Sequence, residues 1–385
     1  MRIFLILLLF LPGCGEVWND PYPVSERGRN ILYTAFTERP KHLDPVQSYT
    51  TDESQFIRQV LEPPLQYHYL KRPYELVPLT AVEVPKPRET DGGRFTVYEI
   101  RIRPGIRYQP HPGFLEENQH LTAGKVEGLQ TPYDLPLGTR ELVADDYIYQ
   151  IKRLAHPRLH SPILGLMSEY IVGLAEFSKA LRKIDTREGW LDLREHALAG
   201  VERVDRYTYR VKLNGRYPQF AYWLAMPFFA PIPWEAEKFF HQPGMAQKNF
   251  TLDWWPVGTG PYVLAENNPN ARMVLERNPN FRGERYPAEG EPEDRAAGLL
   301  ADAGKTMPFI DRVVFSREKE SVPYWNKFLQ GYYDNAGIGS DQFDQAVRVS
   351  IEGAAEPSPE MIEKGIRLST LVSATIYYFG FNMKD

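Results

Sequence analysis

The sequence predicts a mixed α/β protein that contains more than one sheet. Residues 98–103 and 207–213 alternate apolar and polar side chains, and each run is followed by a Pro-Gly or Asn-Gly turn. This period of two is typical of strands with one buried face. Residues 145–154 and 319–329 instead place apolar side chains at helical spacing. Because strands and helices alternate irregularly along the chain, we expect a mixed architecture.

The first structured elements are expected after a polar tether, residues 15–30, and begin with a strand over residues 31–36. Thr51 or Asp52 can cap the helix that follows, because short polar side chains accept hydrogen bonds from the free N–H groups at a helix start. The buried side chains of this helix would be Phe56, Ile57, Val60 and Leu61. Pro63 ends this helix, because a proline makes the helical conformation unfavourable for the residue before it.

Two later helices carry similar signals. Asp145 or Asp146 can open the helix over residues 145–154, which has Ile148, Ile151 and Leu154 on one face. Gly331 follows the helix over residues 319–329, as glycine often does at a helix end. Because adjacent carboxylates diverge on regular structure, we expect Asp145 and Asp146 on a solvated face.

The composition is that of a folded protein. Apolar residues make up 43% of the 385 residues and charged residues 25%, and this length allows two or three domains. The 45 basic and 50 acidic side chains give a formal charge of −5, and no basic run is present. Nucleic acid is therefore not an expected partner, because phosphate binding needs clustered Lys and Arg.

The N-terminus has the pattern of an export signal. Arg2 is followed by the apolar run Ile3–Leu11, which is shorter than the about 20 residues of a membrane-spanning helix. It fits the apolar region of a signal peptide. Leu11-Pro12-Gly13-Cys14 then resembles a bacterial lipobox, and Cys14 is the single cysteine of the chain. We therefore expect residues 1–14 to form a lipoprotein signal that leaves a lipid on Cys14; the alternative is a plain signal peptide with an incidental cysteine.

Two segments are expected to be insertions. Residues 110–142 are rich in Pro, Gly and Glu without periodicity, and residues 284–307 begin with an acidic run that predicts an exposed loop.

Several motifs occur in an order that resembles a known family. They are Leu43-Asp44-Pro45, the run YELVPLTA at 74–81, IRIRPGIRY at 100–108, PVGTGPY at 256–262, LERNPNF at 275–281, FIDRVVF at 309–315 and YYFGFN at 377–382. Together they resemble the extracellular solute-binding proteins of ABC importers, in the oligopeptide- and dipeptide-binding family, family 5. The matches extend from about residue 43 to the last residues of the sequence.

The resemblance implies a periplasmic-binding-protein-like clamp of two lobes with an additional inserted domain. Residues 31–61 and 201–307 would form the first lobe, residues 62–200 the inserted domain, and residues 308–385 the start of the second lobe. Members of the family are longer, so the second lobe is expected to be incomplete in this sequence.

The resemblance also implies a function. The protein would capture oligopeptides or another small ligand in a closing cleft and deliver them to the membrane permease subunits of an ABC transporter. It would be a monomer in the periplasm, held to the membrane by its N-terminal lipid. Neither catalysis nor a cofactor nor a metal is expected.

Two groups of residues are expected at the ligand. In this family the stretch after Leu-Asp-Pro faces the ligand, and here it is Tyr49, Thr50 and Thr51; the alternative is that these residues only cap the next helix. Tyr378 and Asn382 would share one face of a strand, and an Asn side chain can both donate to and accept from a ligand amide. The alternative for this pair is an interior strand with no role in binding.

Other functions have weaker support. His156 and His160 are spaced like zinc ligands on a helix, but Pro157 lies between them and no Glu completes the HExxH pattern. No GxSxG motif is present, and lipid on Cys14 would remove the one thiol, so an exported hydrolase is the less favoured alternative. A structural or interaction lipoprotein that keeps the fold without uptake is the other alternative, and a cleft plugged by residues 110–142 would favour it.

Glycine and tryptophan motifs have simpler interpretations. The glycines at Gly258 and Gly260 lack the Lys and Ser or Thr of a phosphate loop, so we expect them to allow close packing. Trp223, Trp254 and Trp255 could stack on a ligand, although packing is the favoured interpretation.

Overall fold

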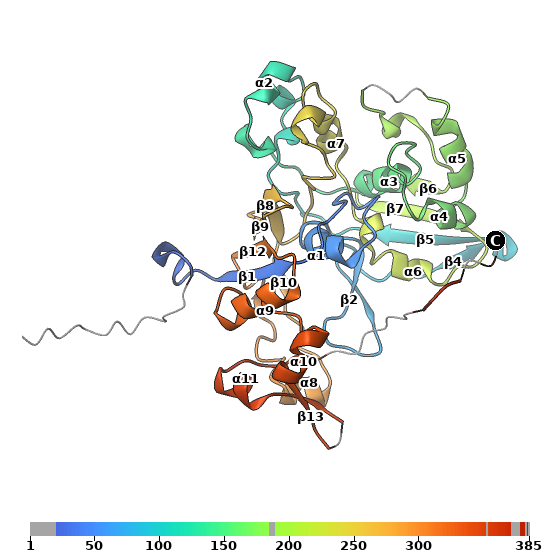
Figure 1. Ribbon diagram of the computed structural model, residues 1–385. Helices are drawn as coiled ribbons and strands as arrows, with labels where there is room; N and C mark the ends of the chain where they lie inside the picture. The colour runs from blue at the N-terminus through green and yellow to red at the C-terminus, as the bar shows by residue number, and fades with distance from the viewer. Residues whose placement is uncertain (1–20, 185–188, 352, 371–377, 382, 384–385) are drawn as a thin grey trace, which may run out of the picture. The chain divides into compact units, whose positions relative to one another are not determined.

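The computed structural model describes residues 21–184, 189–351, 353–370, 378–381 and 383. These residues form two compact units, a larger one over 23–317 and a smaller one that contains residue 22 and the chain from 318 onward (Figure 1). Each unit contains both helices and strands.

The first sheet of the larger unit joins segments from both of its ends. Its strands are β1 (Ile31–Phe36), β8 (Tyr262–Asn268), β9 (Arg272–Arg277) and β12 (Arg312–Arg317), in the order β1-β12-β9-β8. β1 and β12 are parallel, and the other pairs are antiparallel. Helix α1 (Thr51–Val60) packs against this sheet, where the Phe56 ring lies 4.8 Å from that of Phe315.

The second sheet contains the two strands that the alternating pattern predicts. Its order is β4 (Arg88–Thr90), β5 (Phe95–Arg101), β7 (Thr208–Asn214) and β6 (Val201–Arg203), all antiparallel. The inward side chains of β5 and β7 are buried, among them Tyr98, Ile100, Tyr209, Val211 and Leu213. Helix α3 (Ala144–Arg153) packs against β6 and β7.

Several strand pairs join segments that were expected in different lobes or in the inserted domain. β6 and β7, expected in the first lobe, pair with β5 of the expected inserted domain. β12, expected in the second lobe, pairs with β1, and the larger unit ends at Arg317. The period of a strand indicates which face is buried but not which strand is its partner, so the division into lobes and inserted domain stays a prediction.

Shorter elements connect the two sheets. The small strand pairs are β2 (Leu65–Tyr67) with β3 (Leu76–Pro78) and β10 (Glu284–Arg285) with β11 (Thr306–Met307). The helices are α2 (Ala123–Glu127), α4 (Leu164–Tyr170), α5 (Leu174–Leu181), α6 (Phe220–Trp223), α7 (Trp234–Phe240) and α8 (Pro292–Ala296). Both helices begin slightly earlier in the structure than the sequence predicts. Thr50 caps α1, and α3 begins directly after Val143.

The expected insertions have different characters. Residues 284–307 form the β10–β11 pair with α8 between its strands, and most of α8 is exposed. Residues 110–142 pack closely instead: the turn at Pro112–Phe114 contacts α7, and His111 and Pro112 are buried. Their proline and aromatic side chains fill space without a helical or strand period, which explains why no pattern predicts their burial.

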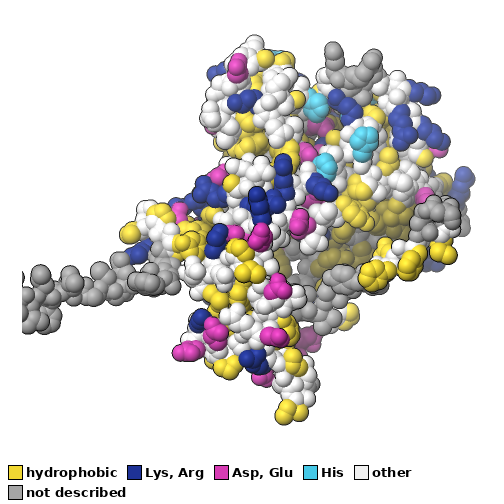
Figure 2. Space-filling model, in the orientation of Figure 1, with side chains coloured by type: hydrophobic (Ala, Val, Ile, Leu, Met, Phe, Trp, Pro, Cys, Tyr) yellow, Lys and Arg dark blue, Asp and Glu magenta, His cyan; other side chains and the backbone are white. Residues whose placement is uncertain are grey.

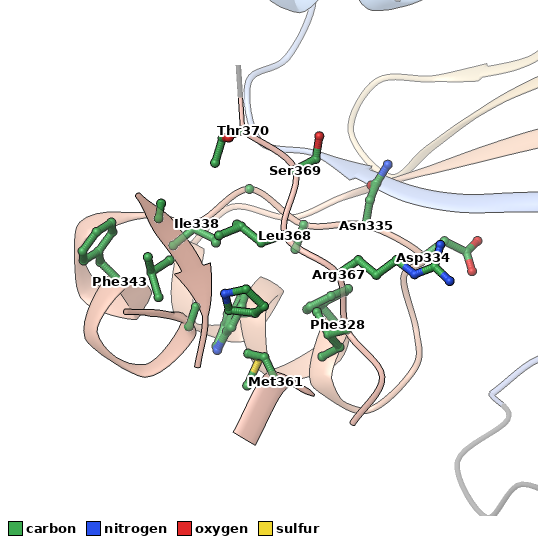
Figure 3. A pocket seen from close by; sticks show the side chains of 18 of the residues that line it. Phe328, Asp334, Asn335, Ile338, Phe343, Met361, Arg367, Leu368, Ser369 and Thr370 are labelled. Carbon is green, nitrogen blue, oxygen red and sulfur yellow. The ribbon is translucent and has the colours of Figure 1, made fainter. Parts of the chain in front are cut away.

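The smaller unit is built around Trp325. It contains α9 (Ser321–Leu329), α10 (Ser340–Ala346), β13 (Val347–Val349), β14 (Ala355–Pro357) and α11 (Pro359–Glu363), and β13 pairs antiparallel with β14. Helix α9 confirms the predicted helix over 319–329. Figure 3 shows Phe328, Phe343, Met361 and Leu368 around a hollow of about 690 Å³. Among the described residues, no predicted ligand-binding residue lines this hollow.

Within the described part of the chain, none of the helices has the length and apolar character needed to cross a membrane.

The two glycines of the Gly-Thr-Gly motif lie against the backbone of α1 and its end. The Gly260 N–H donates to the Val60 carbonyl at 2.9 Å. A Cβ at Gly258 would lie 1.9 Å from the Val60 carbonyl oxygen, and one at Gly260 would lie 2.6 Å from that of Gln59. Glycine is required here because the backbones of two segments approach too closely for any side chain.

Replacing Gly258 with alanine should therefore lower the free energy of unfolding by about 3 kcal/mol, because a backbone carbonyl cannot move aside as a flexible side chain can. Gly124→Ala is the matched control: no atom lies within 4 Å of its Cβ, and alanine in α2 should be neutral or stabilising. Urea denaturation followed by tryptophan fluorescence measures both. Equal effects of the two substitutions would contradict the packing argument.

Candidate functional site

The Leu-Asp-Pro loop is fixed by a buried ion pair. Asp44 and Arg153 have side chains 2% and 1% exposed, and Arg153 Nη1 and Nη2 donate to the Asp44 carboxylate at 2.9 and 2.6 Å. Arg153 Nε also donates to Glu237 of α7 at 2.7 Å. Burial would raise the pKa of Glu237, but the Arg153 charge, a further nearby positive charge and the hydrogen bonds from Tyr149 and Arg153 together outweigh it and lower this pKa to about 2. Asp44 therefore ties the loop to α3 and α7.

A second carboxylate, Glu53, organises the loop between Asp44 and α1. It is 2% exposed and accepts five hydrogen bonds within 3.2 Å. The donors are the backbone N–H groups of Lys41, His42, Tyr49 and Thr50 and the hydroxyl of Ser48. Burial would raise the pKa of Glu53, but these hydrogen bonds outweigh it, so the pKa is lowered. Glu53 was not among the predicted site residues, although Thr50-x-x-Glu53 has the spacing of a capping box.

The three predicted site residues of this loop have different surroundings. The Thr50 hydroxyl accepts the Glu53 N–H at 3.4 Å, so Thr50 is the helix cap that the sequence left as an alternative. Thr51 begins α1 and is exposed. Tyr49 is 71% exposed, and its ring centroid lies 6.2 Å from that of Phe228. Tyr49 and Thr51 thus present side chains outward, whereas the Thr50 hydroxyl is used within the protein.

Tyr49 belongs to one of two groups of neighbouring rings, which meet at adjacent residues of α6 and which we call together the aromatic strip. Its members are Tyr49, Phe228, Trp223, Tyr222, Tyr67 and Tyr74. The ring centroids of Phe228 and Trp223 are 6.2 Å apart, those of Tyr222 and Tyr67 6.4 Å, and those of Tyr67 and Tyr74 5.7 Å. Trp223 and Tyr222 are neighbours on α6. Figure 2 shows hydrophobic side chains gathered over α6.

The strip combines exposed rings with polar groups. Tyr222 and Tyr74 are 49% and 47% exposed, and the Trp223 indole N–H donates to the Tyr217 hydroxyl at 2.8 Å. Exposed rings stack on planar or apolar groups, while tyrosine hydroxyls donate and accept hydrogen bonds. Phe228 itself is buried, 2% exposed, so the exposed aromatic surface lies at Tyr49 and at Tyr222 and Tyr74. Trp255, in contrast, is buried in the core.

The remaining predicted positions lie elsewhere. Tyr378 belongs to the smaller unit and is 86% exposed; residues 378–381 are not in a strand, contrary to the expected strand face. Asn382 and Cys14 lie outside the described residues. Because Tyr49 and Tyr378 belong to different units, the structure defines no single site that contains both.

The histidine pair of the hydrolase alternative lies in a turn. His156 is 7% exposed, its Nδ1 accepts the Arg158 N–H at 3.2 Å, and burial lowers its pKa to about 4. His160 is exposed. Across the described parts of the chain, no group of three His, Cys, Asp or Glu side chains is placed to hold a metal ion.

The fold is that of periplasmic binding proteins, which confirms the predicted class. Helicobacter pylori DppA in complex with the peptide STSA aligns with a TM-score of 0.51 and 18% identity over 89% of this chain and 50% of its own. Listeria monocytogenes OppA bound to peptide aligns with a TM-score of 0.54 and 15% identity over 83% of this chain and 48% of its own.

The chain belongs to the bacterial extracellular solute-binding proteins, family 5, whose middle-region model matches residues 130–385. Curated relatives include the periplasmic oligopeptide-binding protein OppA of Salmonella typhimurium, 29% identical over 140 residues, and that of Escherichia coli, 30% identical over 145 residues. Each alignment covers 36% of this chain and 23% of the relative. The chain thus spans about half of the solved structures and a smaller part of these relatives.

Proposed function

We propose that this chain is part of a substrate-binding protein that captures peptides and delivers them to the membrane permease subunits of an ABC transporter. Membership of the family and the peptide-bound structures with the same fold support this proposal. The observation that carries it is the aromatic strip, which starts at Tyr49 directly after the Leu-Asp-Pro loop and is exposed at both ends.

The strip suits ligands of varied sequence. Tyrosine and tryptophan rings contact apolar side chains through their faces, and water can bridge the tyrosine hydroxyls to a peptide backbone. In this proposal the Tyr49 ring and the Thr51 hydroxyl contact the ligand, and Thr50 contributes backbone groups only, because its hydroxyl caps α1. Tyr378 and Asn382 would contribute from the smaller unit.

The proposal extends to the whole protein. The larger unit would hold the first lobe with its inserted domain, and the smaller unit would begin the second lobe. Closure of the lobes over a peptide would favour the state that binds it more tightly. The protein would act without catalysis, as a monomer in the periplasm, with a lipid on Cys14 as its membrane anchor.

A cleft plugged by residues 110–142 would favour the alternative of a structural or interaction lipoprotein. These residues pack against α7 instead, through His111 and the turn at Pro112–Phe114. Tyr49, at the start of the aromatic strip, stays 71% exposed. The structure therefore offers no support for a plug at this surface.

Substituting alanine for Trp223 should weaken peptide binding about tenfold or more, because central aromatic side chains dominate most binding interfaces. Tyr49→Ala should act in the same direction. Leu137→Ala is the control, since Leu137 is an exposed apolar residue, 44% open to solvent, within the 110–142 segment. Isothermal titration calorimetry of the 385-residue chain with a mixture of tripeptides measures the affinities. Unchanged affinity in both strip variants would overturn the proposed role of the strip.

A further inference from the structure

The larger unit contains a cavity of about 480 Å³ that the proposed function does not use. Its lining comes from α3, from α7 and from the segment 140–143, together with Arg194 and Arg206, and it includes none of the rings of the aromatic strip. Lys152, in the last turn of α3, is a lining residue and is 8% exposed. In the parts of the chain that the structure describes, no other lysine is buried.

The Lys152 ammonium lacks a counter-charge. It donates one hydrogen bond, to the Leu193 carbonyl at 3.1 Å, and it forms no ion pair within 4.0 Å with any described residue. The carboxylates of Asp145 and Asp192 act on it from a greater distance and raise its pKa, but burial outweighs them, so the pKa of Lys152 is lowered. Two of its three N–H groups remain available to a ligand.

The other charged side chains of the cavity are already compensated. Arg140, Arg194 and Arg206 each have a carboxylate within 2.9 Å. Each lining carboxylate forms an ion pair with an arginine, and these carboxylates are Glu141, Asp145, Asp146 and Glu235. Lys152 is therefore the one charged group among the described lining residues that has no ion-pair partner.

These surroundings select the charge and the shape of a ligand. Removing a cation from water is unfavourable unless an opposite charge compensates it, so a buried ammonium without a partner favours an anion. The four lining carboxylates would repel a dianion such as a phosphate ester, which leaves a single negative charge as the best match. Val143, Ile148 and Trp234 supply the apolar part of the lining, and Arg194 lies 3.6 Å from the centroid of the Trp234 ring and so helps to hold it in place.

We propose that this cavity binds a small monocarboxylate with an apolar or aromatic body, and that the carboxylate pairs with the Lys152 ammonium. The body of the ligand would contact Ile148 and Trp234, which line the same cavity. Because the cavity shares no residue with the aromatic strip, this inference goes beyond the proposed peptide-binding function and does not depend on it.

The experiment compares phenylacetate with phenylacetamide, a neutral analogue of similar shape, by calorimetry on the full 385-residue chain at pH 7. We expect the wild type to bind the acid about tenfold more tightly than the amide. Lys152→Gln should bind both ligands with the affinity that the wild type has for the amide, and Lys152→Arg should restore part of the preference. Lys125→Gln, which changes an exposed lysine of α2, should keep the full preference.

A second measurement places the acid at Lys152. The NMR signal of the Lys152 Cε group, assigned by its loss in either Lys152 variant, is followed while each ligand is titrated into the wild type. We expect phenylacetate to shift this signal and phenylacetamide to leave it unchanged. An acid that binds without moving the Lys152 signal would occupy another site and would contradict the proposal.

The comparison of acid and amide in the wild type does not depend on the folding of a variant. Equal affinities for the two ligands, no binding of the acid, or an unchanged preference in Lys152→Gln would overturn the inference. Phenyl phosphate should bind more weakly than phenylacetate, and tighter binding would contradict the choice of a monoanion. If the tripeptide Ala-Phe-Ala displaces phenylacetate from Lys152, the cavity takes a peptide terminus and the assignment to a small acid is wrong.

Discussion

Replacing Arg153 with methionine is expected to destabilise the larger unit by about 3–5 kcal/mol, because breaking a buried ion pair leaves its partners charged and uncompensated. Asp44 and Glu237 would both lose their counter-charge, and each is less than 5% exposed at its side chain. The loss would also free the Leu-Asp-Pro loop, since Asp44 would no longer be tied to α3. Urea denaturation at pH 7 followed by tryptophan fluorescence measures the change.

Arg272→Met provides the control for this prediction. Arg272 pairs with Glu266 at 2.7 Å, but the two side chains are 51% and 39% exposed. A surface pair of this kind contributes at most about 1 kcal/mol. A similar loss of stability in the two variants would show that burial does not set the strength of the Arg153 pairs.

The second large effect is a loss of stability on acidification, caused by His111. This side chain is 0% exposed and is surrounded by the rings of Phe114, Tyr133, Phe239 and Phe240, whose centroids lie 5.3–6.1 Å away. Its Nδ1 accepts the Gly113 N–H at 3.0 Å, so its proton is on Nε2, which has no hydrogen-bond partner among the described residues. Burial lowers the pKa of His111 from 6.5 to about 3.

The sign of the effect follows from proton linkage. The unfolded chain takes up a proton at His111 as the pH falls below 6.5, whereas the folded chain does so only near pH 3. The contribution of His111 to stability is therefore complete above pH 6.5 and is lost as the pH falls toward 3. At about 1.4 kcal/mol per pH unit, the total reaches about 5 kcal/mol, of which about 2 kcal/mol is lost by pH 5.

Urea denaturation at a series of pH values between 7 and 5 tests this prediction in the wild type and in His111→Leu. The variant should lose about half of the pH dependence; the rest comes from His156, whose pKa burial lowers to about 4. Leucine also removes the acceptor for the Gly113 N–H, so stability at pH 7 falls as well. The decisive quantity is the slope of the free energy of unfolding against pH. An unchanged slope in His111→Leu would refute the assignment of this pH dependence to His111.

Local patterns predicted several elements of the fold. Alternation predicted β5 and β7, and helical spacing predicted α1, α3 and α9, because these patterns reflect which face of an element is buried. The close packing of Gly258 was also predicted correctly. The expected solvated position of Asp146 was wrong: its side chain is 2% exposed and accepts from both terminal nitrogens of Arg140. Charged residues are normally exposed, and the six-residue separation of Arg140 and Asp146 matches neither the helical nor the strand period, so no local pattern predicts their contact.

The candidate site was predicted less completely than the fold. The motif after Leu-Asp-Pro pointed to Tyr49, but the other rings of the strip come from two further stretches of the chain, residues 67–74 and 222–228. Tyr67, Tyr74, Tyr222 and Phe228 meet only through the pairing of β2 with β3 and the packing of α6. No period in the sequence relates these positions, so only the tertiary structure could bring them together.

The Glu53 hydrogen bonds have a thermodynamic consequence for ligand capture. They hold the backbone of residues 41–50 in one conformation through a single buried carboxylate. Ordering a loop on binding costs about 1–2 kcal/mol of backbone entropy for each residue that becomes fixed. Here that ordering takes place when the chain folds, so a ligand that meets Tyr49 encounters a preorganised surface, and more of its contact energy remains as affinity.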